Sequence, residues 1–267
     1  TAFVYRPDSV KFPGKRPVLI SIHGGPESQA RPGFQARNNY YVNELGITLV
    51  VPNVRGSSGY GKTFLARDNG FKREDSVKDI GALLDLLAAD PAVDSSRIAV
   101  IGGSYGGYMV AAALAFQPEE FTAGVNIFGV TNWIRTLESI PPWWESFKEA
   151  LYDEMGDPAT DAERHRRISP LFHAENIVKP LLVIQGANDP RVNKAESDQI
   201  VIALRDRGFP VEYLVAPDEG HGFARPVNNM AAFAAAPIAA RRFTGSPWRT
   251  RPGTSPASHH ASFAFPV

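Results

Sequence analysis

Short apolar runs recur along the chain, and glycine, proline or asparagine residues bound them. The runs are 18–22 (VLISI), 47–51 (ITLVV), 98–101 (IAVI), 125–128 (VNIF), 181–184 (LLVI) and 211–215 (VEYLV). Most of them are apolar throughout instead of alternating with polar residues, which is typical of strands buried on both faces of a parallel sheet. We therefore expect these runs to form the strands of one sheet.

Helical periodicity fills segments between these runs. Residues 75–89 place Val77, Ile80 and Leu84 on one face, and residues 194–207 place apolar residues among charged ones before a glycine stop. Strands that alternate with helices indicate an α/β protein with right-handed crossovers. The pattern predicts a doubly wound, mostly parallel sheet with helices on both faces.

Two segments depart from this pattern. Residues 131–165 form a long, aromatic-containing insertion between two strands, and segments of that length usually cover or line a site. Residues 244–267 are rich in Ser, Thr, Pro and Gly and predict a mobile tail. Before the tail, Pro237 is expected to break or kink an alanine-rich helix. We expect one domain over residues 1–243, with the insertion near its functional site.

Charge and hydropathy exclude several classes of protein. The 267 residues include 28 Lys+Arg and 28 Asp+Glu, so the net charge of zero provides no electrostatic footprint for nucleic acid or an anionic membrane. No stretch approaches the roughly 18 apolar residues of a membrane span. We expect a soluble protein without a nucleic-acid or membrane partner. The cytoplasm is the favoured compartment, and the oligomeric state stays open.

The chain contains no cysteine, which excludes disulfides, thiolate metal sites and a cysteine nucleophile. Covalent catalysis would therefore use Ser, Thr, Lys or a carboxylate. The six histidines show no HExxH spacing, and the glycines of GGSYGG lack the lysine of a P-loop. We expect neither a metal nor a cofactor.

The motif that most directly indicates chemistry is G-x-S-x-G at residues 102–106. The apolar run 98–101 leads into it, and the helical stretch YMVAAALAF follows it. This is the strand, nucleophile elbow and helix of serine hydrolases, in which a strained turn lifts the serine hydroxyl clear of the sheet. A glycine-rich turn that merely joins strand to helix is the alternative. The flanking strand and helix favour Ser104 as a nucleophile.

A serine nucleophile needs a general base, and in this arrangement the base is a histidine that comes last in the chain. His221 lies in the turn Pro-Asp-Glu-Gly-His-Gly-Phe, just past the run 211–215, with a glycine on each side. The other histidines after Ser104 lie in a charged run, before a strand or in the tail. They are His165, His173, His259 and His260. His221 is therefore the predicted base.

The base needs a carboxylate to orient it. Asp189 follows the run 181–184 in Gly-Ala-Asn-Asp-Pro-Arg-Val, at the carboxyl end of a strand where such sheets bind ligands. Asp218 is the main rival, but it lies only three residues before His221, too close in sequence to come from a separate strand. The predicted triad is Ser104, Asp189 and His221.

The tetrahedral intermediate also needs N–H donors. One is expected from Tyr105, the residue after the nucleophile. A second is expected from the loop His23-Gly24-Gly25-Pro26, which ends the run 18–22 and whose glycines let backbone N–H groups point into the site. His23 is expected to hold this loop in place.

Five motifs together carry a resemblance to a known family. They are HGGP (23–26), NVRGSSGYG (53–61), GGSYGGY (102–108), SPLFHAENIVKPLLVIQGANDPRV (169–192) and EGHGF (219–223). With them the chain resembles the catalytic domain of the prolyl oligopeptidase family of serine peptidases, in its acylaminoacyl-peptidase and dipeptidyl-peptidase-like branches. The resemblance implies an α/β-hydrolase fold.

The resemblance also implies roles for residues around the triad. Gly25 and Tyr105 would supply the oxyanion N–H groups, and Arg191 would bind a substrate carbonyl. The residues implied near an apolar P1 pocket are Trp143, Trp144, Tyr108 and Val192. For the two tryptophans, ordinary packing of the insertion on the sheet is the alternative.

Three functions follow as hypotheses. The first is a serine hydrolase that cleaves peptide or acyl-amino-acid bonds of small peptides through an acyl-enzyme. The second is a carboxylesterase for small or medium acyl esters, and the third a non-catalytic binding protein with the hydrolase fold. Family members usually carry an N-terminal β-propeller that restricts their substrates, and we expect the 267 residues to hold the hydrolase domain without a propeller.

Overall fold

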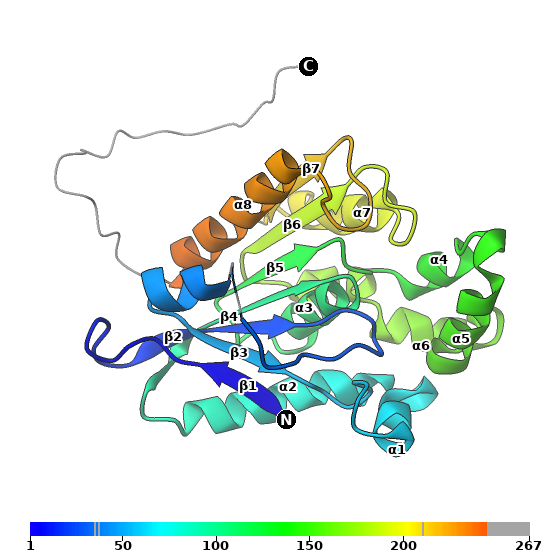
Figure 1. Ribbon diagram of the computed structural model, residues 1–267. Coiled ribbons are helices and arrows are strands. Elements are labelled where there is room, and N and C mark those ends of the chain that lie inside the picture. Colours follow the sequence, from blue (N-terminus) through cyan, green and yellow to red (C-terminus); the bar gives the residue numbers. More distant parts are fainter. Residues whose placement is uncertain (35, 37, 210, 245–267) are drawn as a thin grey trace.

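The computed structural model describes residues 1–244 except 35, 37 and 210, and it contains a seven-stranded sheet in the order β1-β3-β2-β4-β5-β6-β7 (Figure 1). Strand β1 pairs antiparallel with β3, and the remaining pairs are parallel. The strands are β1 (Ala2–Tyr5), β2 (Arg16–Ile22), β3 (Thr48–Pro52), β4 (Val93–Gly103), β5 (Ala123–Ile127), β6 (Leu181–Gly186) and β7 (Val211–Ala216). The predicted, mostly parallel sheet is confirmed.

Helices of different kinds connect the strands. The α-helices are α1 (Lys62–Leu65), α2 (Arg73–Ala88), α3 (Tyr105–Phe116), α4 (Trp133–Glu138), α5 (Glu145–Met155), α6 (Pro158–Ile168), α7 (Lys194–Arg205) and α8 (Pro226–Thr244). The other helical segments are the π-helix η1 (Tyr40–Glu44) and the 3₁₀ helices η2 (Ala66–Asp68), η3 (Gly70–Lys72), η4 (Pro142–Trp144) and η5 (Pro170–Asn176). Both helical segments predicted from periodicity, α2 and α7, are present. Within the described part of the chain, no helix combines the length and apolar composition of a membrane crossing.

The apolar runs form strands because both faces of the sheet are covered. In β2, Ile20 pairs in register with Val50 and Val100 and packs with them in one core cluster. The adjacent Leu19 packs in a different cluster, with Tyr41. Strand β1 was not predicted, because it has four residues at an edge of the sheet and alternates between exposed and half-buried positions.

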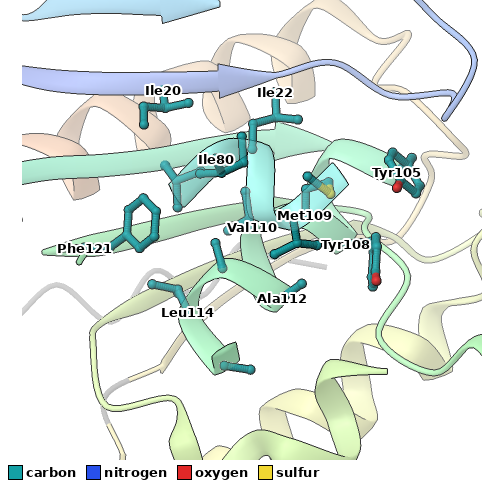
Figure 2. Close-up of a cluster of buried hydrophobic side chains, with 14 of the residues drawn as sticks. Ile20, Ile22, Ile80, Tyr105, Tyr108, Met109, Val110, Ala112, Leu114 and Phe121 are labelled. Atoms are coloured by element: carbon teal, nitrogen blue, oxygen red, sulfur yellow. The ribbon is translucent and has the colours of Figure 1, made fainter. Parts of the chain in front are cut away.

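Helices α2, α3 and α7 contribute to the larger core cluster on one face, and Figure 2 shows the part of it around α2 and α3. Ile80 of α2 and Met109 and Leu114 of α3 are fully buried there. Helix α3 contacts β4, β5 and η5, and eleven of its twelve residues are buried. This explains why its sequence is apolar on all sides, since a helix with no solvent-facing side needs no polar stripe.

The other face is covered by η1 and α8. Ala236 and Ala239 of α8 are buried in a cluster with residues of β5 and β6, and the ring centroids of Tyr40 in η1 and Phe233 in α8 lie 6.5 Å apart. Contrary to expectation, Pro237 does not end α8. A proline removes one backbone hydrogen bond, and the packing of its neighbours against the sheet holds the helix together. Residues 245–267 of the predicted tail lie outside the described residues.

The insertion at 131–165 is mostly helical and lies beyond the carboxyl ends of the central strands (Figure 1). Asn132 begins α4 by accepting a hydrogen bond from Arg135 N, and Asp157 begins α6 by accepting one from Ala159 N. Pro158 occupies the first turn of α6, where its missing N–H costs nothing. These N-terminal caps are the local signals that make the segment helical.

Candidate active site

The strand order creates a crevice at the carboxyl ends of β2 and β4. The chain leaves β2 toward β3 on one side, and it leaves β4 toward β5 on the other. In open α/β sheets, ligands bind at such a switch point. The loop after β2 and the turn after β4 lie against each other here. Their closeness is seen at Gly24, where an added Cβ would lie only 3.3 Å from Ser104 Cβ.

Ser104 sits in the strained turn that the motif predicted. Its backbone has φ 57° and ψ −123°, a left-handed φ that is uncommon outside glycine. A Cβ at Gly102 would lie 2.4 Å from Gly106 O, and one at Gly106 would lie 2.2 Å from Ile22 O. Only glycine fits at these two positions, because strand, turn and helix approach closely around the serine.

Asp189 and His221 lie in two loops that follow neighbouring strands, β6 and β7. Asp189 Oδ2 accepts a hydrogen bond from His221 Nδ1 at 2.8 Å. Its Oδ1 accepts from the backbone N–H groups of Arg191, at 2.8 Å, and Val192, at 2.9 Å. The Asp189 side chain is fully buried, and these donors fix its orientation. The arrangement leaves Nε2 as the imidazole nitrogen that can accept a proton.

Phe128 links the surroundings of the serine to those of the histidine. Its ring centroid lies 4.7 Å from that of His221, and its Cε2 lies 3.3 Å from the place of a Cβ on Gly103. Phe128 has φ 42° and its N–H donates to Ile184 O. This residue was not predicted from the sequence, although its signal was an aromatic side chain at the carboxyl end of a strand.

In the described part of the chain no hydrogen bond joins Ser104 to His221, so that contact stays a prediction.

The rival carboxylate, Asp218, faces other partners. Its Oδ2 lies 3.0 Å from Arg225 Nε and its Oδ1 accepts from Asn228 Nδ2 at 2.9 Å. His165 is buried, and its Nε2 lies 2.8 Å from Met155 O, while His173 Nε2 lies 2.9 Å from Arg167 O. Both histidines thus bond to backbone carbonyls and not to Ser104 or Asp189.

The loop at residues 23–26 carries the predicted oxyanion donors. Gly25 has φ 128°, a conformation that favours glycine. His23 Nε2 lies 2.9 Å from Ser57 Oγ, and its Nδ1 lies 2.7 Å from Gly24 O. Burial lowers the pKa of His23, against the opposing effect of Gly24 O. These bonds hold the loop beside Ser104, the role expected of His23.

The backbone N–H of Tyr105, the other predicted donor, opens α3, where the first N–H groups have no acceptor within the helix. Its side chain joins a buried polar cluster that was not predicted from the sequence. Tyr105 OH lies 3.0 Å from Ser76 Oγ and 3.1 Å from Arg73 Nη1. Arg73 in turn pairs with Glu154 Oε1 at 2.8 Å and with Asp68. The cluster therefore ties helices α2, α3 and α5 together.

Burial dominates the electrostatics of this cluster. It raises the pKa of Glu154 to about 7, and the Arg73 guanidinium opposes the shift. It raises the pKa of Asp68 to about 6, again against Arg73. Burial alone would lower the pKa of Arg73, but Tyr105 and the two carboxylates raise it overall. The cluster thus holds one cation between two carboxyl groups that titrate near neutral pH.

The predicted substrate-binding residues separate into two groups. The Arg191 guanidinium lies over the ring of Trp144, 5.6 Å from its centroid, and Trp143 is 76% exposed. Tyr108 is fully buried against Trp133, with 5.2 Å between the ring centroids. It lines a cavity together with Gln117 and His173. Val192 is buried as well. The structure therefore brings Arg191 and Trp144 together and leaves Tyr108 in the core.

The parallel sheet, its switch point and the strained serine turn between β4 and α3 define the chain as an α/β-hydrolase. A family model described as the prolyl oligopeptidase family matches residues 32–236. The chain therefore belongs to the prolyl oligopeptidase family of serine peptidases.

Individual relatives agree with this assignment. The chain is 43% identical over 217 residues to dipeptidyl aminopeptidase BIII of Pseudoxanthomonas mexicana, across 80% of this chain and 31% of that protein. It is 31% identical over 226 residues to the acylamino-acid-releasing enzyme of Arabidopsis thaliana, across 81% and 29% respectively. A puromycin-hydrolyzing peptidase of Mycobacterium tuberculosis superposes with a TM-score of 0.85 at 26% identity, over 93% of this chain and 38% of the other. The chain thus spans about a third of the length of these relatives.

Proposed function

We propose that this chain is the catalytic region of a serine peptidase in which Ser104, His221 and Asp189 act together. The main support is the 2.8 Å bond between Asp189 Oδ2 and His221 Nδ1, at the same sheet edge as the strained turn of Ser104. The two loops and the elbow follow three different parallel strands, whose carboxyl ends lie at the same edge of the sheet.

The mechanism follows from these positions. Ser104 Oγ attacks the substrate carbonyl while His221 Nε2 takes its proton, and Asp189 keeps the proton on Nδ1. The oxygen that becomes negative is bound by the N–H groups of Tyr105 and Gly25. The imidazolium then protonates the leaving amine. Water enters and repeats the steps on the acyl-enzyme, which releases the acid and restores Ser104.

The substrate class is a peptide or an acylated amino acid. The relatives named above are a dipeptidyl aminopeptidase, an acylamino-acid-releasing enzyme and a puromycin-hydrolyzing peptidase. Arg191 has an exposed guanidinium beside Trp144 and would donate to a substrate carbonyl oxygen. Trp143, Trp144 and Val192 would flank an apolar P1 side chain, and Tyr108 would shape that pocket only through Trp133.

Labelling by a fluorophosphonate probe tests the nucleophile. The unaltered protein should label and Ser104→Ala should not, whereas Ser95→Ala, an exposed position on the same strand, should label normally. Equal labelling of Ser104→Ala and the unaltered protein would overturn the assignment. A folded chain that never labels would support the non-catalytic binding protein.

Substrate turnover distinguishes peptidase from esterase. We expect hydrolysis of acyl- or aminoacyl-p-nitroanilides, since the site offers a general acid for the poor amine leaving group. Carboxylesterase is the second candidate, because the exposure of Trp143 favours an open site that accepts simple esters. Turnover of p-nitrophenyl butyrate without any anilide turnover would favour the esterase.

A further inference from the structure

A cavity of about 360 Å³ lies on the face of the sheet that η1 and α8 cover. Ile101 of β4 and Ile127 of β5 line it, with Ala232 and Phe233 of α8 and Tyr41 of η1. None of its lining residues in the described part of the chain is charged. The volume falls within the usual range for cavities that bind small molecules. Three lining residues, Ser21, Asn38 and Asn229, are polar, and the rest of the wall is apolar, aromatic or glycine. Such a cavity suits an uncharged, mainly apolar group.

This cavity extends to the candidate catalytic residues. The two glycines that precede Ser104 line it, as do the two residues that follow His221. Phe128, whose ring packs on His221, is also part of the wall. The cavity therefore adjoins both the serine turn and the histidine loop.

A second cavity, of about 490 Å³, adjoins the site from the oxyanion side. Its wall includes Gly25 and Glu27 from the loop after β2, and Leu151 and Glu154 from α5. The two cavities share no lining residue within the described part of the chain. One is thus associated with the oxyanion loop and the other with His221.

The chemistry of the proposed mechanism indicates which part of the substrate lies next to the cavity beside His221. The histidine must protonate the leaving amine, so the leaving group has to lie within hydrogen-bond reach of the imidazole. A side chain on that leaving group would lie on the histidine side of Ser104, and the cavity at that side is bounded by Phe128, Phe223 and Ala232.

We propose that this cavity binds the residue on the leaving-group side of the scissile bond, and that it selects an aromatic or branched aliphatic side chain there. The proposal rests on the proposed serine peptidase function and adds the specificity of one subsite. Charged leaving-group residues should be disfavoured, because the lining offers no ion-pair partner among the described residues and a buried unpaired charge is costly.

Partitioning of a single acyl-enzyme tests the proposal independently of the acyl side. p-Nitrophenyl butyrate would form the butyryl-enzyme, which water or an added amino acid amide then attacks. The amine nitrogen forms a bond to the acyl carbon as the bond to Ser104 Oγ breaks, and the amine proton returns through His221 to Ser104 Oγ. We expect aminolysis by phenylalaninamide or leucinamide to exceed that by glycinamide by on the order of 10-fold or more.

Two tryptophan substitutions on α8 provide a matched pair. Ala232→Trp would fill the cavity and should bring the ratio of phenylalaninamide to glycinamide aminolysis close to one. Ala234→Trp adds the same side chain at an exposed position of the same helix and should keep the ratio of the unaltered protein. Ala232→Leu, a smaller change, should give an intermediate ratio and serves if the tryptophan variant does not fold.

The outcomes separate this inference from the function on which it rests. If p-nitrophenol release shows no acyl-enzyme, the serine peptidase proposal fails and the subsite fails with it. If the acyl-enzyme forms but the unaltered protein does not discriminate between the amides, only the subsite is overturned. The subsite alone is likewise overturned if Ala232→Trp and Ala234→Trp, or Ala232→Leu and the unaltered protein, have equal ratios.

Discussion

Both carboxylate oxygens of Asp189 accept hydrogen bonds from groups around it. One oxygen receives two backbone N–H groups of its own loop, and the other receives His221 Nδ1–H. The backbone bonds hold the carboxylate in place, and the carboxylate fixes the tautomer of the imidazole. A side chain of the same shape with the wrong hydrogen-bonding pattern would therefore leave the fold intact and disturb the base.

Asp189→Asn should lower kcat by about 10⁴-fold with little change in KM, because the amide favours the tautomer in which Nε2 carries the proton. Steady-state hydrolysis of p-nitrophenyl butyrate measures both constants. Asp218→Asn is the matched control, since Asp218 pairs with Arg225 and not with His221. A large loss of kcat in Asp218→Asn would instead make that residue the orienting acid.

The candidate site was predictable at this scale where its signals are local. Ser104, Asp189 and His221 lie in turns that follow apolar runs, and glycines flank the serine and the histidine. Phe128 could not be assigned in the same way, because its role depends on a ring contact with His221, which lies far away in the sequence. Tyr108 was expected near the substrate, but burial under Trp133 removes it from the surface of the crevice.

At the scale of elements, the insertion shows the same difference between local signals and contacts that join residues far apart in the sequence. Its helices α4 and α6 begin at Asn132 and Asp157 with capping bonds to residues close in sequence. These local signals are present in the sequence, although only an insertion near the site was predicted from it. The contact between Glu154 of α5 and Arg73 of α2 joins residues 81 positions apart. No periodicity indicates it, because a buried ion pair depends on how whole helices pack.

The cluster around Arg73 makes stability depend on pH. The folded chain raises the pKa of Glu154 to about 7 and that of Asp68 to about 6, above their ordinary values of 4.5 and 3.8. Between roughly pH 4 and 7 the folded state therefore binds more protons than the unfolded state. The stability from these two carboxyl groups is greatest at acidic pH and is lost as the pH rises through 6 to 7.

Arg73→Met should make this dependence much steeper. At pH 8 it leaves two buried carboxylates without a cation, and we expect a loss of about 3–5 kcal/mol in the free energy of unfolding. At pH 5.5 the carboxyl groups can hold protons, so the loss should be clearly smaller. Urea denaturation at the two pH values measures the difference.

Arg55→Met provides the control for this experiment. Arg55 pairs with Asp75 and Asp79 of α2, the helix that also carries Arg73, but a third of the Arg55 side chain is exposed to solvent. Water screens a partly exposed pair, so the loss in Arg55→Met should be smaller than in Arg73→Met and nearly the same at both pH values. A loss in Arg73→Met that is the same at both pH values would contradict the electrostatic account and leave only lost packing.

At the scale of the molecule, the residues of the proposed site follow strands that differ in how many neighbouring strands they pair with. Strand β4, which leads to Ser104, pairs with β2 and β5 near the middle of the sheet. Strand β7, which leads to His221, pairs only with β6 among the described strands and is half-buried over most of its length. Elements at a sheet edge open at lower free energy than the core. His221 should therefore leave its position in the site before the rest of the sheet unfolds.

Urea should accordingly lower the rate of fluorophosphonate labelling at concentrations where the far-UV circular dichroism is still native. Tyr213→Phe should widen the gap between the two curves, because it removes the 2.8 Å hydrogen bond from β7 to Asp198 on α7. Tyr5→Phe, the same change on the opposite edge strand β1, should leave the gap as it is. Labelling and circular dichroism curves that coincide in all three proteins would mean that β7 unfolds with the central strands and that the site is lost only with the whole sheet.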